Sequence, residues 1–511
     1  MNVSMQSVTR DMVWQLPARI AVIDVGSNTV RLVAFDIQGR IPQLIFNEKA
    51  FCGLGKALAT TGRLDPEGME LALNAIHRYV TLADQMRVSH MDIVATAAVR
   101  EAANRDSFAA QVEEITGGRA LRIISGVEEA HYAALGVVAA IPDADGVAGD
   151  LGGGSLELVG IDRGTVRDGE SLPLGTLRLL DAHGGNMTAA GKAVEASLAE
   201  LSWLKEFKGR NLYAVGGTWR AIARLHMTVR NYPLRILHNY EIDGGEARRF
   251  LRDIATHATE ANALAAGVPR KRIPMLPVAA MVMARLLKRL SPDRVVISGL
   301  GLREGILFHH APEELKRADP LLAFCREMAT RRSRFPEHGD DLMHWIDPLF
   351  AGENIREKRL RYAVCLLSDI AWSGHPSYRA ELAMDQIMLA QVLGTDHPGR
   401  AFIGLALFVL NGGSAEAPGT ERARDLLGPP EIARARAVGL ALRLAQRISG
   451  GTQELLGLSH LGLDAERITL TIAPHGEYMT GESVERRLQI LADAMSRQPA
   501  ITVEDPAPSA K

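Results

Sequence analysis

The pattern of apolar and polar positions predicts the same β-hairpin at two places in the chain. In each copy an apolar segment ends at an aspartate, turns through glycine and small polar residues, and continues as a second, alternating segment. The two copies are IDVGSNTVRLVAFD at 23–36 and GDLGGGSLELVGID at 149–162. Aligning them matches Asp24 with Asp150 and Gly26 with Gly152. Because alternating segments around a glycine turn are typical of a hairpin, we predict a duplicated supersecondary unit.

Each predicted hairpin tip places backbone N–H groups beside a carboxylate. The tips consist of Asp24, Gly26, Ser27, Asn28 and Thr29, and of Asp150, Gly152, Gly153, Gly154 and Ser155. N–H groups without bulky side chains form an anion site, and a carboxylate can hold a metal ion that bridges phosphate oxygens. A glycine-rich hairpin can also be a simple tight turn. A turn does not need an aspartate at the end of a buried strand, however, where an unpaired carboxylate is costly. The duplication therefore favours two tips that hold a polyphosphate from both sides.

The segments around the hairpins predict an α/β architecture. After the first hairpin, a helical stripe at 65–86 with Leu71, Ile76, Val80 and Leu82 inward precedes a strand at 91–96, a helix at 105–116 and a strand at 121–124. The second half repeats this plan with a helix at 188–207, a strand at 212–215, a helix that ends at 290 and a strand at 295–298. We therefore expect two similar lobes.

Two strand-to-helix junctions carry candidate chemistry. Glu128 and Glu129 follow the strand at 121–124 and open a helix that extends through residue 140. Catalytic groups of α/β folds commonly lie at such junctions, but acidic residues there also complement the helix dipole. In the second half, Gly216, Gly217 and Thr218 open a helix in the same way, which makes them a candidate phosphate site.

Composition narrows the class of protein. The 511 residues suffice for about three domains, and 58 basic against 60 acidic residues give no basic field for nucleic acid. The three cysteines, Cys52, Cys325 and Cys365, show no ligand spacing and are expected to be reduced, buried thiols. Residues 1–19 contain no apolar leader, and no segment approaches a membrane-spanning run. We expect a cytoplasmic protein that neither inserts into membranes nor binds nucleic acid.

Taken in order, the motifs resemble those of the exopolyphosphatase / guanosine pentaphosphate phosphohydrolase (Ppx/GppA) family. This family belongs to the superfamily of actin-like, Hsp70-like and sugar-kinase ATPases. The likeness covers nearly all of residues 20–310. It rests on IDVGSNTVRLVAFD (23–36), ATAAVR (95–100), ISGVEEA (124–130), GDLGGGSLELV (149–159), LPLGTLRL (172–179), AVGGTWRAIA (214–223) and SGLGLREGIL (298–307).

The resemblance implies roles for residues in these motifs. The two hairpin tips correspond to phosphate-binding loops, Asp150 and Glu157 to the residues that hold an essential Mg²⁺, and Arg100 to a phosphate-binding arginine. Glu128 corresponds to the catalytic base, and the loop from Gly216 to Thr218 faces a nucleotide in members that cleave guanosine pentaphosphate. Mn²⁺ is the alternative metal, and a monovalent cation such as K⁺ is a further expectation, as is a homodimer.

The resemblance also implies the fold and the domain boundaries. Two duplicated actin-like (ribonuclease H-like) ATPase lobes of α/β class are expected at 20–141 and 142–310, after an N-terminal tail at 1–19. An α-helical, degenerate HD-like C-terminal domain is expected at 311–495, followed by a disordered, proline-rich tail at 496–511.

The C-terminal part contains a series of helical patterns whose chemistry is less defined. The His-Asp pair of an HD site is replaced here by Ser368-Asp369, so a second metal centre is not expected. His338, His344, His375 and His397 lack a common ligand spacing and are interpreted as surface or capping residues. A basic cluster of Arg326, Arg331, Arg332 and Arg334 could line a track for a polyanion or form a solvated helix face, since acids are interspersed nearby.

The sequence thus predicts a metal-dependent exopolyphosphatase that releases orthophosphate from the end of inorganic polyphosphate. The alternative substrate is guanosine pentaphosphate, because it presents the same terminal phosphoanhydride. Two other classes stay open: an ATPase that shares the double hairpin, and a catalytically silent sensor of polyphosphate or of guanosine pentaphosphate.

Overall fold

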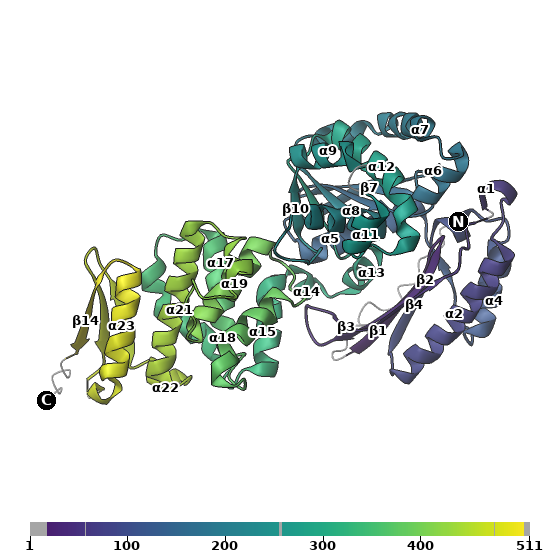
Figure 1. Cartoon of the computed structure of the whole chain (residues 1–511). Helices are drawn as coiled ribbons and strands as arrows, with labels where there is room; N and C mark the ends of the chain where they lie inside the picture. The colour runs from purple at the N-terminus through teal and green to yellow at the C-terminus, as the bar shows by residue number, and fades with distance from the viewer. Residues whose placement is uncertain (1–17, 57, 255–257, 475, 505–511) are drawn as a thin grey trace. The chain divides into compact units, whose positions relative to one another are not determined.

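The computed structural model describes residues 18–504 except 57, 255–257 and 475. The chain forms two compact units, the first ending at Ala318 and the second beginning at Asp319 (Figure 1). This division lies somewhat further along the chain than the predicted boundary at residue 310. The predicted N-terminal tail lies outside the described residues, apart from Ala18 and Arg19, which already belong to the first strand.

Lobe I, the N-terminal lobe of the first unit, contains a five-stranded sheet of order β3-β2-β1-β4-β5. Strands β1 and β2 pair antiparallel as the predicted hairpin, with Asp24 opposite Arg31, while β4 runs parallel to β1. The elements are β1 Ala18–Val25, β2 Thr29–Ile37, β3 Gln43–Phe51, α1 Leu58–Thr61, α2 Pro66–Gln85, β4 His90–Ala95, α3 Ala97–Glu101, α4 Arg105–Ile115 and β5 Arg122–Ile123.

Lobe II contains a six-stranded sheet of order β10-β11-β9-β6-β7-β8. The second predicted hairpin is β6 and β7, with Asp150 opposite Glu157. The elements are β6 Gly146–Leu151, β7 Leu156–Asp162, β8 Thr165–Leu172, α6 Thr176–His183, α7 Met187–Glu200, η1 Ser202–Phe207, β9 Asn211–Val215, α8 Gly217–Val229, β10 Tyr240–Asp243, α9 Gly244–Arg252, α11 Glu260–Ala265, η2 Arg270–Met275, α12 Leu276–Leu290 and β11 Arg294–Ile297.

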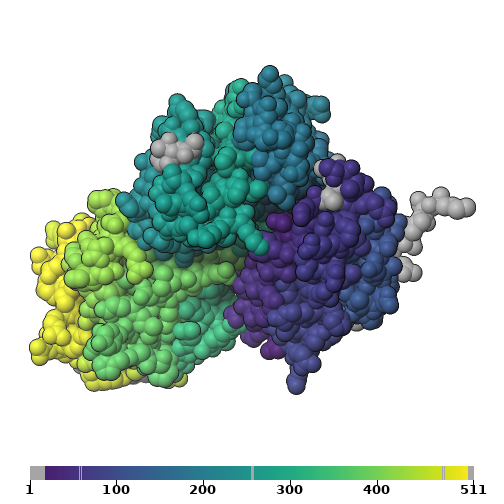
Figure 2. Space-filling view, turned by 45° about the vertical axis from the view of Figure 1, so that its right-hand side comes forward, coloured from purple at the N-terminus to yellow at the C-terminus, as the bar shows by residue number. Residues whose placement is uncertain are grey.

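The two sheets share one plan, which confirms the α/β fold with a duplicated unit. Read from its far edge, β8-β7-β6-β9-β11 of lobe II repeats β3-β2-β1-β4-β5 of lobe I. In both, two antiparallel hairpin pairings are followed by a parallel strand on the other side of the first strand. The carboxyl ends of β1 and β6 therefore carry equivalent tips. Figure 2 shows the surface of this unit, with lobe I in purple and blue and lobe II in teal.

Two helices each pack on the lobe to which they do not belong in sequence. Helix α5 (Gly126–Ala140) follows lobe I in the sequence, yet Ala130, Ala134 and Val137 pack against apolar residues of the lobe II sheet. Helix α13 (Leu302–His310) follows lobe II, yet Leu302 and Ile306 pack on the lobe I sheet. A short helix, α14 (Glu313–Arg317), then ends the first unit. Each sheet thus buries one face under a helix that begins beside the other lobe.

Glycines allow α5 and α13 to touch through their backbones. A β-carbon on Gly305 would overlap the carbonyl oxygen of Tyr132, and one on Gly136 would overlap that of Gly301. We expect Gly305→Ala to lower the free energy of unfolding by about 1–3 kcal/mol, because the two helices must move apart. Denaturant unfolding of the intact chain measures this. Gly352→Ala, whose β-carbon meets no atom, should stay within about 0.5 kcal/mol of wild type, and an equal loss in both variants would contradict the close contact.

Two details of the predicted helices are wrong. The buried stripe of α2 consists of Gly68, Ala72, Ile76, Tyr79, Val80 and Ala83. Leu71 is 45% exposed, because the adjacent position Ala72 faces the core and successive helical residues differ by about 100°. The helix expected at 188–207 breaks at Leu201, whose ψ of 83° is not helical, and continues as the short helix η1.

The second unit is mainly helical, as predicted, and also contains a small sheet. Its helices are α15 Pro320–Arg332, α16 His338–Ile346, η3 Asp347–Phe350, α17 Ile355–Leu366, η4 Pro376–Tyr378, α18 Arg379–Met388, α19 His397–Leu410, α20 Glu421–Arg424, α21 Pro429–Ser449, α22 Gln453–Leu456, η5 Glu477–Met479 and α23 Glu482–Ala494. The strands are β12 Ser459–Leu463, β13 Arg467–Ile472 and β14 Gln498–Val503, in the order β12-β13-β14.

Strand β14 corrects the prediction of a disordered tail from Ser496. Gln498–Val503 pairs in parallel with β13, and Leu470 lies opposite Ile501. The pairing partner is distant in sequence, so the proline-rich composition alone did not reveal it. Residues 505–511 lie outside the described residues.

Two further expectations concern thiols and membranes. The three cysteines are free and buried, as predicted. Within the described part of the chain, no helix combines the length and apolar character that crossing a membrane requires.

Candidate functional site

A cleft in the first unit is lined by both hairpin tips and by the loop that opens α8. The predicted metal-binding residues and all the predicted phosphate-binding residues except Arg100 line it. From lobe I these are Asp24, Gly26, Ser27, Asn28 and Thr29, and from lobe II they are Asp150, Gly152, Gly153, Gly154, Ser155, Glu157, Gly216, Gly217 and Thr218. The structure therefore brings together segments that are up to about 190 residues apart.

The two tips have the same turn and face each other closely. The amide of Gly26 donates to the carbonyl of Thr29 at 2.9 Å, and the amide of Gly152 donates to that of Ser155 at 3.0 Å. A β-carbon on Gly154 would lie 2.9 Å from Oγ of Ser27 in the opposite tip. Only glycine allows the tips to approach this closely while keeping their backbones accessible.

Four carboxylates form an acidic group in this cleft: Asp24, Glu129, Asp150 and Glu157. Burial raises the pKa of Asp150 to about 6 against the lowering by Arg220 and Arg303, and the nearby Asp24 adds to the rise. Burial also raises the pKa of Asp24. For Glu157, burial together with Glu129 and Asp150 raises the pKa well above its ordinary value. The carboxylates are thus close enough to disfavour each other's charged forms.

Glu129, and not the predicted Glu128, is the glutamate of α5 that faces the cleft. Glu128 is exposed and forms a capping box with Ser125: its Oε2 accepts from the Ser125 amide at 2.8 Å, and its own amide donates to Ser125 Oγ at 3.1 Å. Because neighbouring helical residues differ by about 100°, Glu129 turns inward when Glu128 caps the helix. Burial raises the pKa of Glu129 to about 7, although the ion pair with Arg100 opposes the rise.

Arg100 lies beside this glutamate. Its Nη1 donates to Glu129 Oε2 at 2.9 Å and to the carbonyl oxygen of Ile124 at 3.0 Å, and it does not itself line the cleft. In this structure the predicted phosphate-binding arginine therefore orients Glu129.

The acidic group fits a divalent cation by its chemistry. Hard cations such as Mg²⁺ prefer carboxylate oxygens, and a cation would relieve the mutual repulsion that raises these pKa values. Glu157 is already oriented, because Ser171 Oγ donates to its Oε1 at 2.7 Å. Among the residues described, no three His, Cys, Asp or Glu side chains converge as a ready-made metal cage. Mg²⁺ usually takes one or two protein carboxylates, with water and phosphate oxygens completing its shell, so such a cage is not required.

Cationic side chains that the sequence analysis did not single out line the rest of the cleft. They are Arg31, Lys49, Arg220, Lys271, Arg272 and Arg303. Burial and the neighbouring Arg272 and Arg31 lower the pKa of Lys49 to about 8. Arg303 Nη1 lies 3.7 Å from Asp24 Oδ2. Arg31, Arg220 and Arg303 lie within the quoted motifs, which was the available signal. Lys49 lies on β3, whereas Lys271 and Arg272 lie on the short helix η2 far along the chain.

Phe51 connects cationic residues of the two lobes. The ammonium group of Lys49 lies 4.3 Å from the centre of its ring, and that of Lys271, from lobe II, lies 4.2 Å from it. Such cation–π contacts hold both ammonium groups beside the cleft.

In the second unit, the degenerate HD position is occupied by an ion pair. Arg334 donates from its amide, Nε and Nη2 to the Asp369 carboxylate, with Nη2 to Oδ1 at 2.7 Å. Arg326 makes a bidentate pair with Asp340 at 3.0 Å. Two of the four arginines of the predicted track, Arg326 and Arg334, are therefore neutralised by acids, which favours the alternative of a solvated helix face.

The four histidines of this unit that the sequence analysis interpreted divide into two pairs. His375 caps η4, and His344 is exposed, as interpreted. His338 and His397 are buried, which corrects their interpretation as surface residues. His338 fills a core position where its Nε2 lies 3.2 Å from Ser449 Oγ.

Two family models match the chain. The model described as Ppx/GppA phosphatase family matches residues 33–314, more than half of the chain, and the model described as exopolyphosphatase, C-terminal, matches residues 321–501. The chain belongs to the Ppx/GppA phosphatase family.

Similar proteins include two mycobacterial exopolyphosphatases and a solved exopolyphosphatase structure. Exopolyphosphatase 1 of Mycobacterium leprae (strain TN) is 28% identical over 312 residues, which cover 58% of this chain and 90% of the mycobacterial one. Exopolyphosphatase 2 of Mycobacterium tuberculosis is 25% identical over 311 residues, covering 56% and 97%. A crystal structure of an exopolyphosphatase from Cytophaga hutchinsonii has a TM-score of 0.52 and 26% identity, covering 57% of this chain and 96% of that one. The Ppx/GppA likeness thus extends over both lobes and the cleft between the hairpin tips.

Proposed function

We propose that the protein is an exopolyphosphatase, which hydrolyses the terminal phosphoanhydride of inorganic polyphosphate and releases orthophosphate. The observation that carries this proposal is that one cleft contains the two facing glycine tips, the acidic group and a cationic wall. The cationic wall consists of Arg31, Lys49, Arg220, Lys271, Arg272 and Arg303. The tips suit a terminal phosphate, and the cationic wall suits the chain that follows it. The names of the mycobacterial and Cytophaga relatives support the same substrate.

Different residues of the cleft carry out different parts of the reaction. Amides of the hairpin tips donate to the oxygens of the terminal phosphate and orient it. Glu129 accepts a proton from the attacking water, whose oxygen forms the new bond to phosphorus as the bond to the bridging oxygen breaks. The shortened polyphosphate is a good leaving group, and Arg272, Lys49 and Lys271 neutralise its charge. Electrostatic stabilisation of this kind supplies most of the catalysis in phosphoryl transfer.

A divalent cation, Mg²⁺ with Mn²⁺ as the alternative, would be held by Asp150 and Glu157, with Asp24 nearby. When bound, it would neutralise phosphate oxygens and lower the barrier to attack by water. The chain's own contribution is the carboxylate set and its orientation by Ser171.

The rate of hydrolysis should depend on pH through the ionisation of the Glu129 carboxyl. Its carboxyl must be ionised to accept a proton, and burial raises its pKa to about 7. We therefore expect kcat/KM for long polyphosphate to fall about tenfold per pH unit below about 7. Initial rates of phosphate release over a pH series at constant ionic strength measure this. The residual activity of Glu129→Gln should lack this limb; a variant that keeps the limb would assign it to another group.

The stability of the protein should depend on pH through the acidic group, and this can be measured without substrate. The pKa of Asp150 is raised to about 6 in the folded state, so between about pH 4 and 6 the unfolded chain ionises first and stability falls as pH rises. We expect the Tm of wild type, relative to that of Asp150→Asn, to decrease from about pH 4 to about pH 7 without divalent cations. Adding Mg²⁺ should raise the wild-type Tm more at the higher pH, because protons and the cation compete for the carboxylates. A difference that is independent of pH would contradict the raised pKa.

Guanosine pentaphosphate is the second candidate substrate. Gly216, Gly217 and Thr218, which resemble the loop facing a nucleotide in some members, line the cleft. Phosphate release from long polyphosphate, guanosine pentaphosphate and ATP by the intact protein decides between the classes. A higher kcat/KM for polyphosphate supports the proposal. Preference for either nucleotide would replace it, and no release from any of the three would favour a sensor.

A further inference from the structure

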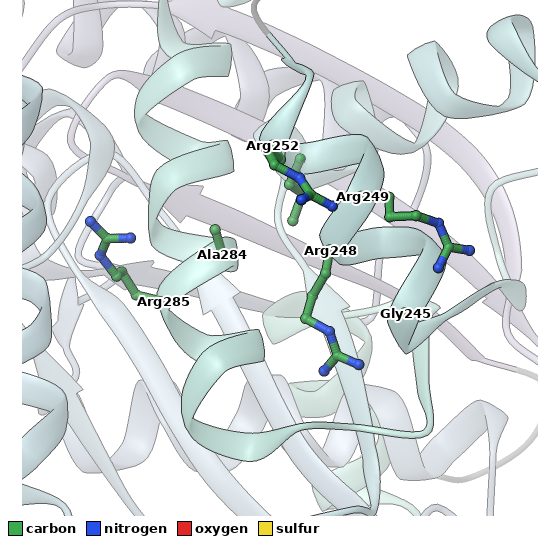
Figure 3. Close-up of a pocket in the computed structure, with 7 residues that line it drawn as sticks. Gly245, Arg248, Arg249, Arg252, Ala284 and Arg285 are labelled. Atoms are coloured by element: carbon green, nitrogen blue, oxygen red, sulfur yellow. The ribbon is translucent and has the colours of Figure 1, made fainter.

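A second hollow lies on the surface of lobe II, between α9 and α12. Four arginines line it, Arg248, Arg249 and Arg252 from α9 and Arg285 from α12, and its other lining residues are glycine or apolar. No acidic residue lines it. Figure 3 shows Arg248 and Arg252 on the side of α9 towards α12, with Arg249 and Arg285 reaching outward to either side. The guanidinium groups therefore spread over both helices and do not converge on one point.

The ion pairs around this groove engage few of its arginines. Arg248, Arg249 and Arg252 are exposed and form no ion pair within the described residues. The acid of the same helix, Glu246, is engaged by Arg230 at 2.7 Å. On α12, Arg285 and Lys288 share a single carboxylate, Glu195, each at 3.2 Å. A net positive strip therefore extends across the two helices.

The stability of helix α9 explains the presence of only some of these arginines. Cations in the last turn of a helix interact favourably with its dipole, which accounts for Arg249 and Arg252. It accounts neither for Arg248 nor for Arg285 on the neighbouring helix. Like charges at positions i and i+4, such as Arg248 and Arg252, destabilise an isolated helix by a few tenths of a kcal/mol. A ligand that pairs with them would remove this cost.

The position and chemistry of the groove favour an extended phosphate chain as this ligand. Helix α12 follows Met275, which lines the cleft, and Arg285 lies ten residues further, about 15 Å along the helix axis. Guanidinium groups match phosphate oxygens in a bidentate way. Single-stranded nucleic acid usually needs aromatic side chains on which bases stack, and none lines this groove.

We propose that the groove between α9 and α12 is an exosite that binds a polyphosphate segment outside the cleft. This inference rests on the proposed function. A chain whose end lies between the hairpin tips and whose body lies on the exosite is held at two places, so its end returns to the cleft at high effective concentration. A short chain reaches only the cleft. The exosite thus favours long substrates without touching the reacting phosphate.

The test replaces the three arginines of α9 together, as R248Q/R249Q/R252Q. We expect KM for long-chain polyphosphate to rise about tenfold or more at low salt, with kcat within about twofold of wild type and with tripolyphosphate kinetics unchanged. The salt dependence of long-chain binding should also become shallower, since fewer phosphate contacts release counterions. A charge-matched control, K205Q/K208Q/R235Q, removes three exposed cations of lobe II that line neither the cleft nor the groove, and should behave as wild type.

Each outcome distinguishes the exosite from the proposed function. If both triple variants change long-chain KM equally, or if tripolyphosphate is affected as strongly, the exosite is overturned while the hydrolase proposal stands. If wild type releases no phosphate from polyphosphate, the hydrolase proposal fails, and binding of long-chain polyphosphate followed by fluorescence anisotropy still tests the groove. Loss of single-stranded DNA binding with polyphosphate binding intact would overturn the exosite in favour of a nucleic-acid surface.

Discussion

Glu129→Gln is expected to lower kcat for polyphosphate hydrolysis by about 10²–10⁴-fold, the usual contribution of a general base. The amide keeps the size of the side chain, but it cannot accept the proton of the attacking water. It also loses the charge that pairs with Arg100 at 2.9 Å, so binding of the polyanion should be maintained or strengthened. Steady-state phosphate release gives kcat, and anisotropy of labelled polyphosphate gives binding.

The matched control is the same substitution one residue earlier. Glutamine can complete a capping box as glutamate does, so Glu128→Gln should keep both the helix start and the activity of wild type. Glu128→Ala should cost about 1 kcal/mol of stability and little activity. If Glu128→Gln were the inactive variant and Glu129→Gln the active one, the assignment from the helix orientation would be wrong.

Asp150→Asn is expected to raise the Mg²⁺ concentration for half-maximal activity by at least about 10- to 100-fold, a loss that even residues outside the ligand shell can cause. The amide has lost the charge that a hard cation prefers. Glu157→Gln should act in the same direction. Mg²⁺ titrations of the initial rate, at a fixed polyphosphate concentration, measure the effect.

Asp162→Asn is the matched control for the metal-binding carboxylates. Asp162 ends the same hairpin but pairs with Arg167 and Arg210 away from the cleft, so its Mg²⁺ titration should superimpose on that of wild type. A wild-type titration for Asp150→Asn would leave that residue with a structural role and move the metal to the other carboxylates of the cleft.

The duplicated hairpin could be predicted because its information is local. Strand alternation, the glycine turn and the terminal aspartate all lie within fourteen residues, and the structure reproduces them in both lobes. The cationic wall could not be predicted in the same way. Lys49 and Lys271 come from different lobes and meet only through the ring of Phe51. Their proximity depends on tertiary packing, which no local pattern records.

The choice between Glu128 and Glu129 shows a second limit. Both are acidic residues in the first turn of α5, and sequence spacing does not tell which of them faces the cleft. The orientation is set by the capping box with Ser125 and by the ion pair with Arg100. Strand β14 shows the same limit at the other end of the chain, because its partner β13 lies beyond an intervening helix.

The backbone contact between α5 and α13 links the two lobes beside the cleft. Both helices begin at the cleft, where α5 carries Glu129 and α13 carries Arg303, and they then cross at Gly136 and Gly305. Backbones in direct contact leave no room for the helices to approach further, and a larger side chain at the contact would force them apart. The close contact therefore sets the spacing of the two helices that carry Glu129 and Arg303 to the cleft. A side chain at Gly136 or Gly305 is therefore expected to alter the cleft, although neither glycine lines it.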